Sequence, residues 1–236
     1  MAGRAEIVGF RGELLEPGDA GYGEARRLWN GAVDKHPVLI ARCTGAADVS
    51  AGIAHARAGG LPLAIRGGGH NVAGTASCDG GLVLDLSPMK DVRVDPATGV
   101  VWAQPGLLWG ELDQATQRFG LATTGGVVTH TGVAGLTLGG GIGWLMRRHG
   151  LTCDNLLAVE MVTADGRRLR VDGREQPELF WGSAEAAGTS AWSPPSSSAF
   201  TRSAPRCWPG RSCMRPSRRA RCFAATATGR PAPRTR

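Results

Sequence analysis

Residues 66–71 read Arg-Gly-Gly-Gly-His-Asn and directly follow the apolar run Leu-Pro-Leu-Ala-Ile over residues 61–65. Three consecutive glycines let a backbone approach a large anion closely, with its N–H groups directed at the ligand. A second glycine block, Gly-Gly-Gly-Ile-Gly over residues 139–143, follows about seventy residues later. Two such loops, far apart in the sequence, predict one extended cofactor that is held at two places.

Neither glycine block matches the common nucleotide-binding patterns. A Rossmann site requires G-x-G-x-x-G, but Val72 and Trp144 stand where the third glycine is required. A P-loop requires Gly-Lys-Ser/Thr, whereas Lys35 and Lys90, the two lysines of the chain, follow Asp and Met. The sequence therefore indicates glycine-rich nests of another type, with Arg66 as a candidate charge partner for a phosphate.

The composition changes abruptly near Gly182. Residues 1–182 contain 17 Lys and Arg against 19 Asp and Glu, whereas residues 183–236 contain ten Arg, one acid and no Leu, Ile or Val. A segment of this kind cannot bury enough apolar area to offset the entropy lost on ordering. We therefore expect a folded domain over residues 1–182 and a low-complexity, disordered tail over residues 183–236.

Within residues 1–182 the apolar spacing alternates between helical and strand periods. Glycines and turn residues bound most of these segments. The mixture of helix-linked and hairpin-linked strands predicts an α+β fold. The spacing predicts helices over 23–32, 44–59 and 108–119, strands over 36–42, 61–65 and 81–86, and hairpins over 92–103 and 159–171.

The sequence gives no indication of a metal site, an export signal or a membrane span. None of the six cysteines forms a C-x-x-C pair, which disfavours a zinc ribbon or a thioredoxin motif. The N-terminus lacks the apolar stretch of a signal peptide, and no run approaches eighteen apolar residues. We therefore expect a cytoplasmic protein with free thiols and no membrane partner.

Several segments between residues 22 and 182 resemble the FAD-linked oxidases with a PCMH-type FAD-binding domain, and within them the berberine-bridge-enzyme-like group. Their order and spacing together make the resemblance specific. The segments are YGEARRLWNG over 22–31, LAIRGGGHN over 63–71, TGVAGLTLGGGIGWL over 131–145, GLTCDNL over 150–156 and ELFWG over 178–182.

The resemblance implies a domain of two small α/β subdomains that binds FAD. It also implies a covalent bond from the His70 ring to the flavin 8α-methyl carbon, although a loop histidine that only hydrogen-bonds stays an alternative. The cofactor-binding residues implied are Arg66, Gly67, Gly68, Gly69, His70, Asn71, Thr131, Gly132, Val133, Gly135, Gly139, Gly140, Gly141 and Gly143.

Three further residues bear on the attachment. Some relatives carry a second bond from a cysteine, but Val128 occupies its place here, so we expect single, histidyl attachment. Cys153 lies in a different motif, where a packing role is favoured. For His130 two interpretations stay open: it faces the isoalloxazine, or it is a simple loop residue.

The family resemblance implies an oxidoreductase that moves a hydride from an alcohol, a sugar or a secondary metabolite to flavin N5, with reoxidation by dioxygen. The partners expected are thus a small-molecule substrate and O2. The sequence assigns no catalytic base and no oligomeric state. A flavin-binding remnant without catalysis is the alternative. Specific nucleic-acid binding is disfavoured because the tail has one short basic cluster, over residues 215–221, and no reader motif.

The tail also suggests a change of reading frame. After residue 182 the family continues with Arg-Gly-Gly-Gly-Gly-Asn-Phe-Gly-Val-Val and a substrate domain, whereas residues 183–193 read SAEAAGTSAWS. GC-rich codons assigned to these eleven residues, read from one base earlier, give Val-Arg-Gly-Gly-Gly-Gly-Asn-Phe-Gly-Val-Val. We therefore hypothesise that residues 183–236 are translated out of frame.

Overall fold

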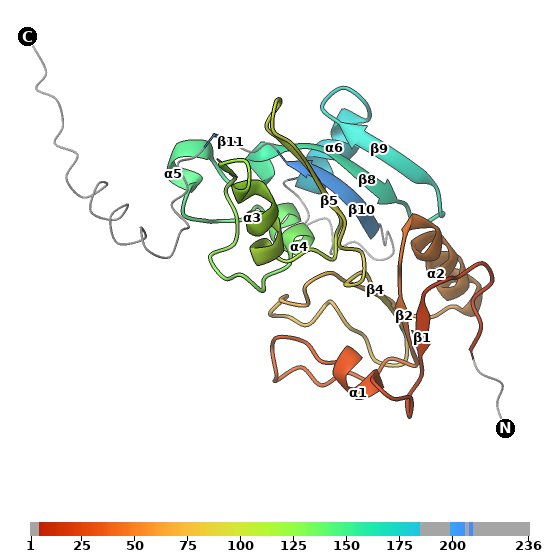
Figure 1. The fold of residues 1–236 in the computed structure, drawn as a ribbon. Coiled ribbons are helices and arrows are strands. Elements are labelled where there is room, and N and C mark those ends of the chain that lie inside the picture. Colours follow the sequence, from red (N-terminus) through yellow and green to blue (C-terminus); the bar gives the residue numbers. More distant parts are fainter. Residues whose placement is uncertain (1–4, 185–198, 206–207, 210–236) are drawn as a thin grey trace, which may run out of the picture.

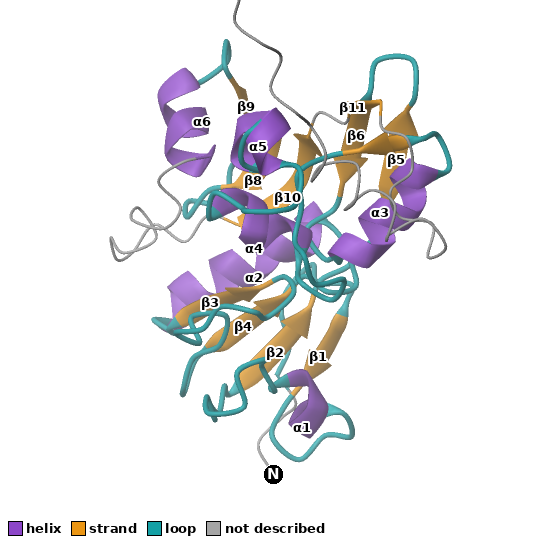
Figure 2. Ribbon diagram, turned by 90° about the vertical axis from the view of Figure 1, so that its left-hand side faces the viewer, coloured by secondary structure: helices purple, strands orange, loops and turns teal. Residues whose placement is uncertain are grey.

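The computed structural model describes residues 5–184, 199–205 and 208–209, and it has the α+β architecture expected. Two sheets occupy the two halves of the molecule (Figure 1). Helix α2 (Ala46–Gly59) lies between the sheets (Figure 2) and contacts strands of both. Gly68 of the first glycine loop, in one half, lies against Gly132, in the other half.

The first sheet carries the first glycine loop at one end. Its order is β1 (Glu13–Leu15), β2 (Leu39–Arg42), β4 (Leu82–Asp85) and β3 (Leu63–Arg66), with β2, β4 and β3 parallel and β1 antiparallel. All four residues of β4 are buried because it lies inside the sheet. The predicted face of α2, formed by Val49, Ile53 and Ala56, is buried in the same core cluster as this strand.

The second sheet is antiparallel and contains both predicted hairpins. Its order is β5 (Val92–Asp95), β6 (Val100–Ala103), β10 (Ala199–Pro205), β8 (Leu156–Val162) and β9 (Arg168–Asp172). Helices α3 (Trp109–Gln117), α4 (Val133–Leu138) and α6 (Pro177–Ala184) lie in this half (Figure 1). The remaining short elements are β7 (Leu121–Ala122), which pairs with β11 (Trp208–Pro209), α5 (Met146–His149) and a 3-10 turn over Cys153–Asn155.

The predicted helix over residues 23–32 is wrong beyond its first turn. Helix α1 covers only Tyr22–Ala25. The guanidinium of Arg66 donates hydrogen bonds to the backbone carbonyls of Ala25 and Arg27, the second over 3.4 Å. Because a continuing helix needs those carbonyls for its own ladder, the half-buried guanidinium of Arg66 ends it.

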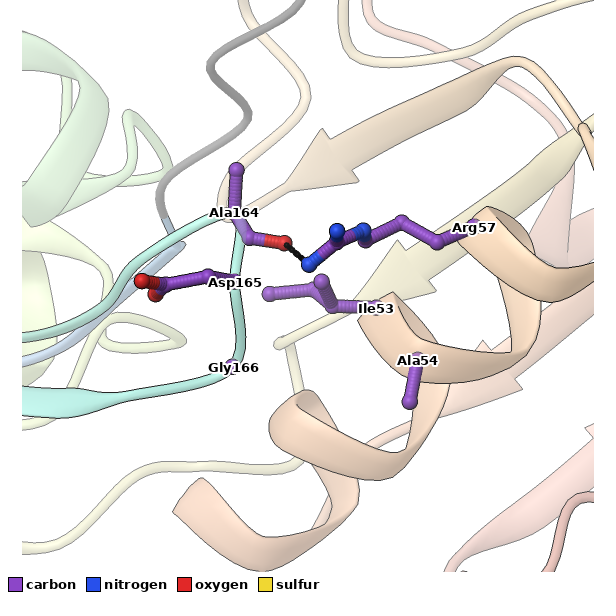
Figure 3. Close-up of a pocket in the computed structure, with 6 residues that line it drawn as sticks. All are labelled: Ile53, Ala54, Arg57, Ala164, Asp165 and Gly166. Atoms are coloured by element: carbon purple, nitrogen blue, oxygen red, sulfur yellow. Dashed lines mark hydrogen bonds between the residues drawn. The ribbon is translucent and has the colours of Figure 1, made fainter.

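A hydrogen bond between helix α2 and the β8–β9 hairpin joins the two halves of the molecule. Arg57 Nη1 donates to the backbone carbonyl of Ala164 in the β8–β9 hairpin over 2.9 Å. Figure 3 shows this contact in a small pocket, whose lining residues are Ile53, Ala54, Arg57, Ala164, Asp165 and Gly166. None of the residues of the glycine loops lines it.

Most of the segment predicted to be a disordered, out-of-frame tail lies outside the described residues, so that prediction stays a prediction. Within residues 183–236 the structure describes the last two residues of α6 and the strands β10 and β11. The basic cluster over residues 215–221 also lies outside the described part. Among the helices that are described, none has the length and apolar content that a membrane span requires.

Candidate functional site

The first glycine loop, residues 66–71, follows β3 and presents a series of backbone N–H groups. Within the described part of the chain, the backbone N–H groups of residues 67–71 donate no hydrogen bond to the protein. Gly69 is buried at φ 69°, a left-handed conformation that favours glycine, while residues 67, 68 and 70 are half-buried. Adjacent backbone N–H groups of this kind form a concave site for an anion.

The second loop touches the first at a contact that only glycine permits. A Cβ atom added at Gly68 would lie 2.4 Å from the backbone nitrogen of Gly132, and one added at Gly132 would lie 2.5 Å from that of Gly68. A Cβ at Gly67 would lie 3.0 Å from the carbonyl oxygen of Pro105. The structure thus brings Gly68 of the first loop against Gly132, in the segment 131–145 that carries the second glycine block.

Backbone bonds fix the start of the second loop. Trp109 N–H donates to the carbonyl of Thr131, and Val133 N–H donates to that of Leu107, each over 2.9 Å. Gly132 is the residue before α4 and has an extended conformation. Thr131, Gly132 and Val133 therefore lie beside the first loop, as the predicted site requires.

The glycine block over residues 139–143 lies at the other end of α4. Six helical residues separate it from Gly132, a rise of about 9 Å. A Cβ at Gly143 would lie 2.1 Å from the carbonyl oxygen of Gly125, and Gly141 has φ 77° beside Thr152. The predicted residues Gly139, Gly140, Gly141 and Gly143 thus lie apart from the contact between the loops, and Gly135 lies on α4 between the two groups. An extended ligand fits this elongated arrangement better than a compact one.

The ring of Trp109 packs against Gly125, whose backbone in turn lies against Gly143 of the second loop. Trp109 is fully buried, and Cβ atoms added at Gly125 and Gly126 would lie 2.3 Å and 2.8 Å from its ring atoms. The indole Nε1 has no hydrogen-bond partner in the described part of the protein. The ring therefore contributes shape and apolar area to this loop.

Arg66, predicted as a phosphate partner, is paired within the protein. Its Nε and Nη2 donate to the two carboxylate oxygens of Asp85 over 3.1 Å and 2.7 Å. Asp85 is fully buried and also accepts hydrogen bonds from Ser87. The role of Arg66 in cofactor binding stays a prediction; in the structure its charge is already compensated.

The His70 ring stacks on Trp29 and lies tilted against His130. Its ring centroid lies 5.1 Å from that of Trp29, with 18° between the planes, and 4.8 Å from that of His130. His130 Nδ1 and His70 Nε2 form a hydrogen bond of 2.9 Å. Burial, and then the neighbouring His130, lower the pKa of the His70 imidazole, while a backbone hydrogen bond to His130 acts in the opposite direction. His70 is therefore neutral at pH 7, with one nitrogen lone pair available for bonding.

Trp29 is a site residue that the sequence analysis did not identify. Its backbone N–H donates to the carbonyl of Gly69 over 3.2 Å, so the segment after α1 is tied to the glycine turn. The signal was its place in the segment 22–31 that resembles the family, within the helix predicted over 23–32. The structure also places His130 next to His70, which favours a site role over a simple loop residue.

Several apolar side chains near the second loop in the sequence are exposed. Val127, Val128, Ile142 and Trp144 are 57, 41, 67 and 73% exposed. Cys153, by contrast, is buried in the core cluster of the second sheet, which fits the packing role expected. In the described residues no cluster of three or more His, Cys, Asp or Glu side chains is placed to hold a metal ion. The site thus combines backbone N–H groups without acceptors among the described residues, an imidazole and exposed apolar side chains nearby in the sequence.

Comparison with known proteins identifies what this site resembles. A family model described as an FAD binding domain matches residues 37–172. The chain is 38% identical over 177 residues to (R)-6-hydroxynicotine oxidase of Paenarthrobacter nicotinovorans, a match that covers 75% of this chain and 39% of that protein.

Two solved structures have the same fold over most of the chain. The structure of 6-hydroxy-D-nicotine oxidase from Arthrobacter nicotinovorans superposes with a TM-score of 0.79 at 35% identity, covering 84% of this chain and 42% of that one. The berberine-bridge-enzyme-like protein 1 of Physcomitrella patens gives a TM-score of 0.77 at 27% identity, covering 84% and 42%. The chain therefore spans about two fifths of the length of the relatives it matches.

Proposed function

Because the chain belongs to the FAD binding domain family of the FAD-linked oxidases, we propose that it holds FAD between residues 67–71 and 131–143 and attaches it covalently through His70. The observation that carries the proposal is the contact of Gly68 with Gly132, beside five consecutive backbone N–H groups that have no acceptor among the described residues. These donors suit the pyrophosphate of a dinucleotide, and the exposed apolar side chains beside the second loop suit a flat ring system.

Attachment through His70 is chemically reasonable for this imidazole. The bond forms between a ring nitrogen of His70 and the 8α carbon of the flavin. The ring N–H and one C–H bond of the 8α-methyl group give up protons, and the two electrons of that C–H bond stay on the flavin until dioxygen removes them. His70 is half-buried and its lowered pKa keeps the ring neutral, so that a lone pair is available at neutral pH.

When bound, FAD supplies hydride acceptance at N5 and reoxidation by dioxygen. The protein contributes the binding and orientation that residues 67–71 and 131–143 provide. We propose a small organic substrate, such as an alcohol, a sugar or an amine-containing metabolite. The nicotine oxidase that the chain matches is named for a substrate of the last kind.

Reconstitution of the full 236-residue chain with FAD tests the proposal. We expect a yellow protein that keeps its colour after acid precipitation, and flavin mass on the tryptic peptide of residues 67–90, which contains a single histidine, His70. The variant His70→Ala is expected to bind FAD but to lose it on denaturation. A wild-type chain that retains no FAD on gel filtration would contradict the proposal.

A panel of amines, sugars and alcohols then separates turnover from binding alone. Bleaching of the flavin under nitrogen, and recovery of the colour on admitting air, are the results expected of an oxidase. A protein that keeps FAD covalently but is bleached by none of these compounds would support a flavin-binding protein without catalysis.

A further inference from the structure

His70 is held by two aromatic neighbours that come from distant parts of the chain. Trp29 stacks nearly parallel to it at 5.1 Å, and His130 approaches it at 4.8 Å with 37° between the rings. Trp29 is further tied to the glycine turn by its backbone hydrogen bond to Gly69. The imidazole is therefore fixed in orientation before any ligand binds.

The hydrogen bond between the two histidines determines which nitrogen of His70 is free to react. It joins His130 Nδ1 to His70 Nε2 over 2.9 Å, so one of these atoms carries the proton and the other accepts it. The contact engages Nε2 of His70 whichever atom carries the proton. A neutral His70 ring with its proton on Nε2, directed at His130, therefore presents the lone pair of Nδ1.

We propose that His130 is a positioning residue for the flavin attachment: it holds the proton of His70 on Nε2, directs bond formation to Nδ1, and accepts that proton as the bond forms. This role rests on the attachment through His70 proposed above. His130 acts on the flavin only through His70.

The proton balance supports this role. When Nδ1 forms its bond to carbon, the imidazole becomes cationic, with its remaining proton on Nε2. His130 Nδ1 lies 2.9 Å away and takes that proton, which restores a neutral, alkylated His70. His130 is exposed, so it passes a proton to water and returns to its starting state. Trp29 stabilises the transient cation, because an indole face attracts a cation within about 6 Å of its centroid.

The test compares rates of covalent attachment in the full chain. Apoprotein is mixed with FAD, and flavin that survives denaturation is measured over time by in-gel fluorescence. We expect His130→Ala to bind FAD as tightly as the wild type but to attach it about 100-fold more slowly, the size typical of a lost proton acceptor. Free imidazole is expected to restore much of the rate. His36→Ala, an exposed histidine away from the loops, is the matched control and is expected to attach FAD at the wild-type rate.

The attached atom gives a second readout. Nuclear magnetic resonance of the flavin peptide from residues 67–90 is expected to show the bond at Nδ1 of His70 in the wild type. A bond at Nε2 would overturn the proposal. A wild-type attachment rate in His130→Ala, or a slow rate that imidazole does not restore, would do the same while leaving attachment itself intact.

Failure of attachment has a different signature. A wild-type chain that binds FAD but loses all of it on denaturation, as His70→Ala is expected to do, would overturn the covalent bond proposed above. That result would also overturn the role proposed for His130, which depends on the covalent bond.

Discussion

The two glycine loops meet at one contact, but different forces hold them in place. Behind the first loop, at the end of β3, lies the buried ion pair of Arg66 with Asp85. Behind the second loop lies the buried ring of Trp109, against Gly125 and Gly126. The position of the first loop therefore depends on an ion pair, and that of the second loop depends on the packing of a large side chain. Both loops are proposed to bind the same ligand through their backbone. This difference predicts distinct responses to mutation and to pH.

The largest loss of stability is expected when the volume behind the second loop is removed. Replacing Trp109 by Ala leaves a large cavity and is expected to lower the free energy of unfolding by about 3–5 kcal/mol, measured by urea denaturation. Trp109→Phe keeps most of the ring. It is expected to cost much less, because Nε1 has no hydrogen-bond partner in the described structure. Trp181→Ala, at a 58% exposed position, is the control and is expected to change stability by about 0.5 kcal/mol or less. Equal losses in Trp109→Ala and Trp181→Ala would contradict a packing role for Trp109.

Removing the charge behind the first loop is expected to cost nearly as much. Asp85→Asn leaves the Arg66 guanidinium in a mostly buried position without its carboxylate, and breaking a buried pair in this way costs about 3 kcal/mol or more. The measurement is again urea denaturation. Asp165→Asn is the matched control, because Asp165 pairs with Arg167 at the surface and its loss is expected to leave the unfolding midpoint unchanged. If both variants unfold at the wild-type midpoint, charge does not hold the first loop.

The contact between the loops is expected to be less costly to disturb but more damaging to binding. Gly68→Ala and Gly132→Ala each place a methyl group about 2.5 Å from backbone atoms of the other loop, which forces them apart at about 1–3 kcal/mol. We expect FAD affinity to fall by about tenfold or more, or ~1.4 kcal/mol, as measured by fluorescence titration. Gly173→Ala, where an added Cβ meets nothing within 4 Å, is the control. Wild-type affinity in both loop variants would show that the contact does not shape the binding site.

Much of the fold was predictable because it depends on local pattern. The buried face of α2, the strands β3 and β4 and both hairpins follow from periods and turn residues within a few positions of each other. Helix α1 was overestimated because its end is set by Arg66, about forty residues further along the chain. The sequence near residue 25 contains no sign that Arg66 contacts this helix end.

The site was predictable as two loops and a histidine, but its internal arrangement was not. The family resemblance selected residues 66–71 and 131–143, and glycine spacing alone supports a close approach of backbone to a ligand. Two features join residues that lie far apart in the sequence: the contact of Gly68 with Gly132, and the ring contacts of His70 with Trp29 and His130. The spacing of apolar residues reports local structure and does not reveal such contacts. The pairing of Arg66 with Asp85 was missed for the same reason, and it gives the Arg66 charge a partner within the protein.

The smallest expected effect is a pH dependence of the free energy of unfolding that arises from His70 in the first loop. The pKa of His70 is lowered in the folded state, first by burial and then by His130, so the unfolded chain binds its proton more readily. Folding is therefore penalised at pH values below about 6.5, the pKa of an unperturbed histidine, and the penalty disappears as the pH rises through that value. Unfolding free energies at pH 5.5 and 7.5 are expected to show a smaller acid loss in His70→Asn than in the wild type. Asp113, whose pKa burial raises to about 6, contributes an opposite slope, but both proteins contain it and the difference between them excludes it. Parallel profiles for the two proteins would mean that the stack around His70 leaves its protonation unperturbed.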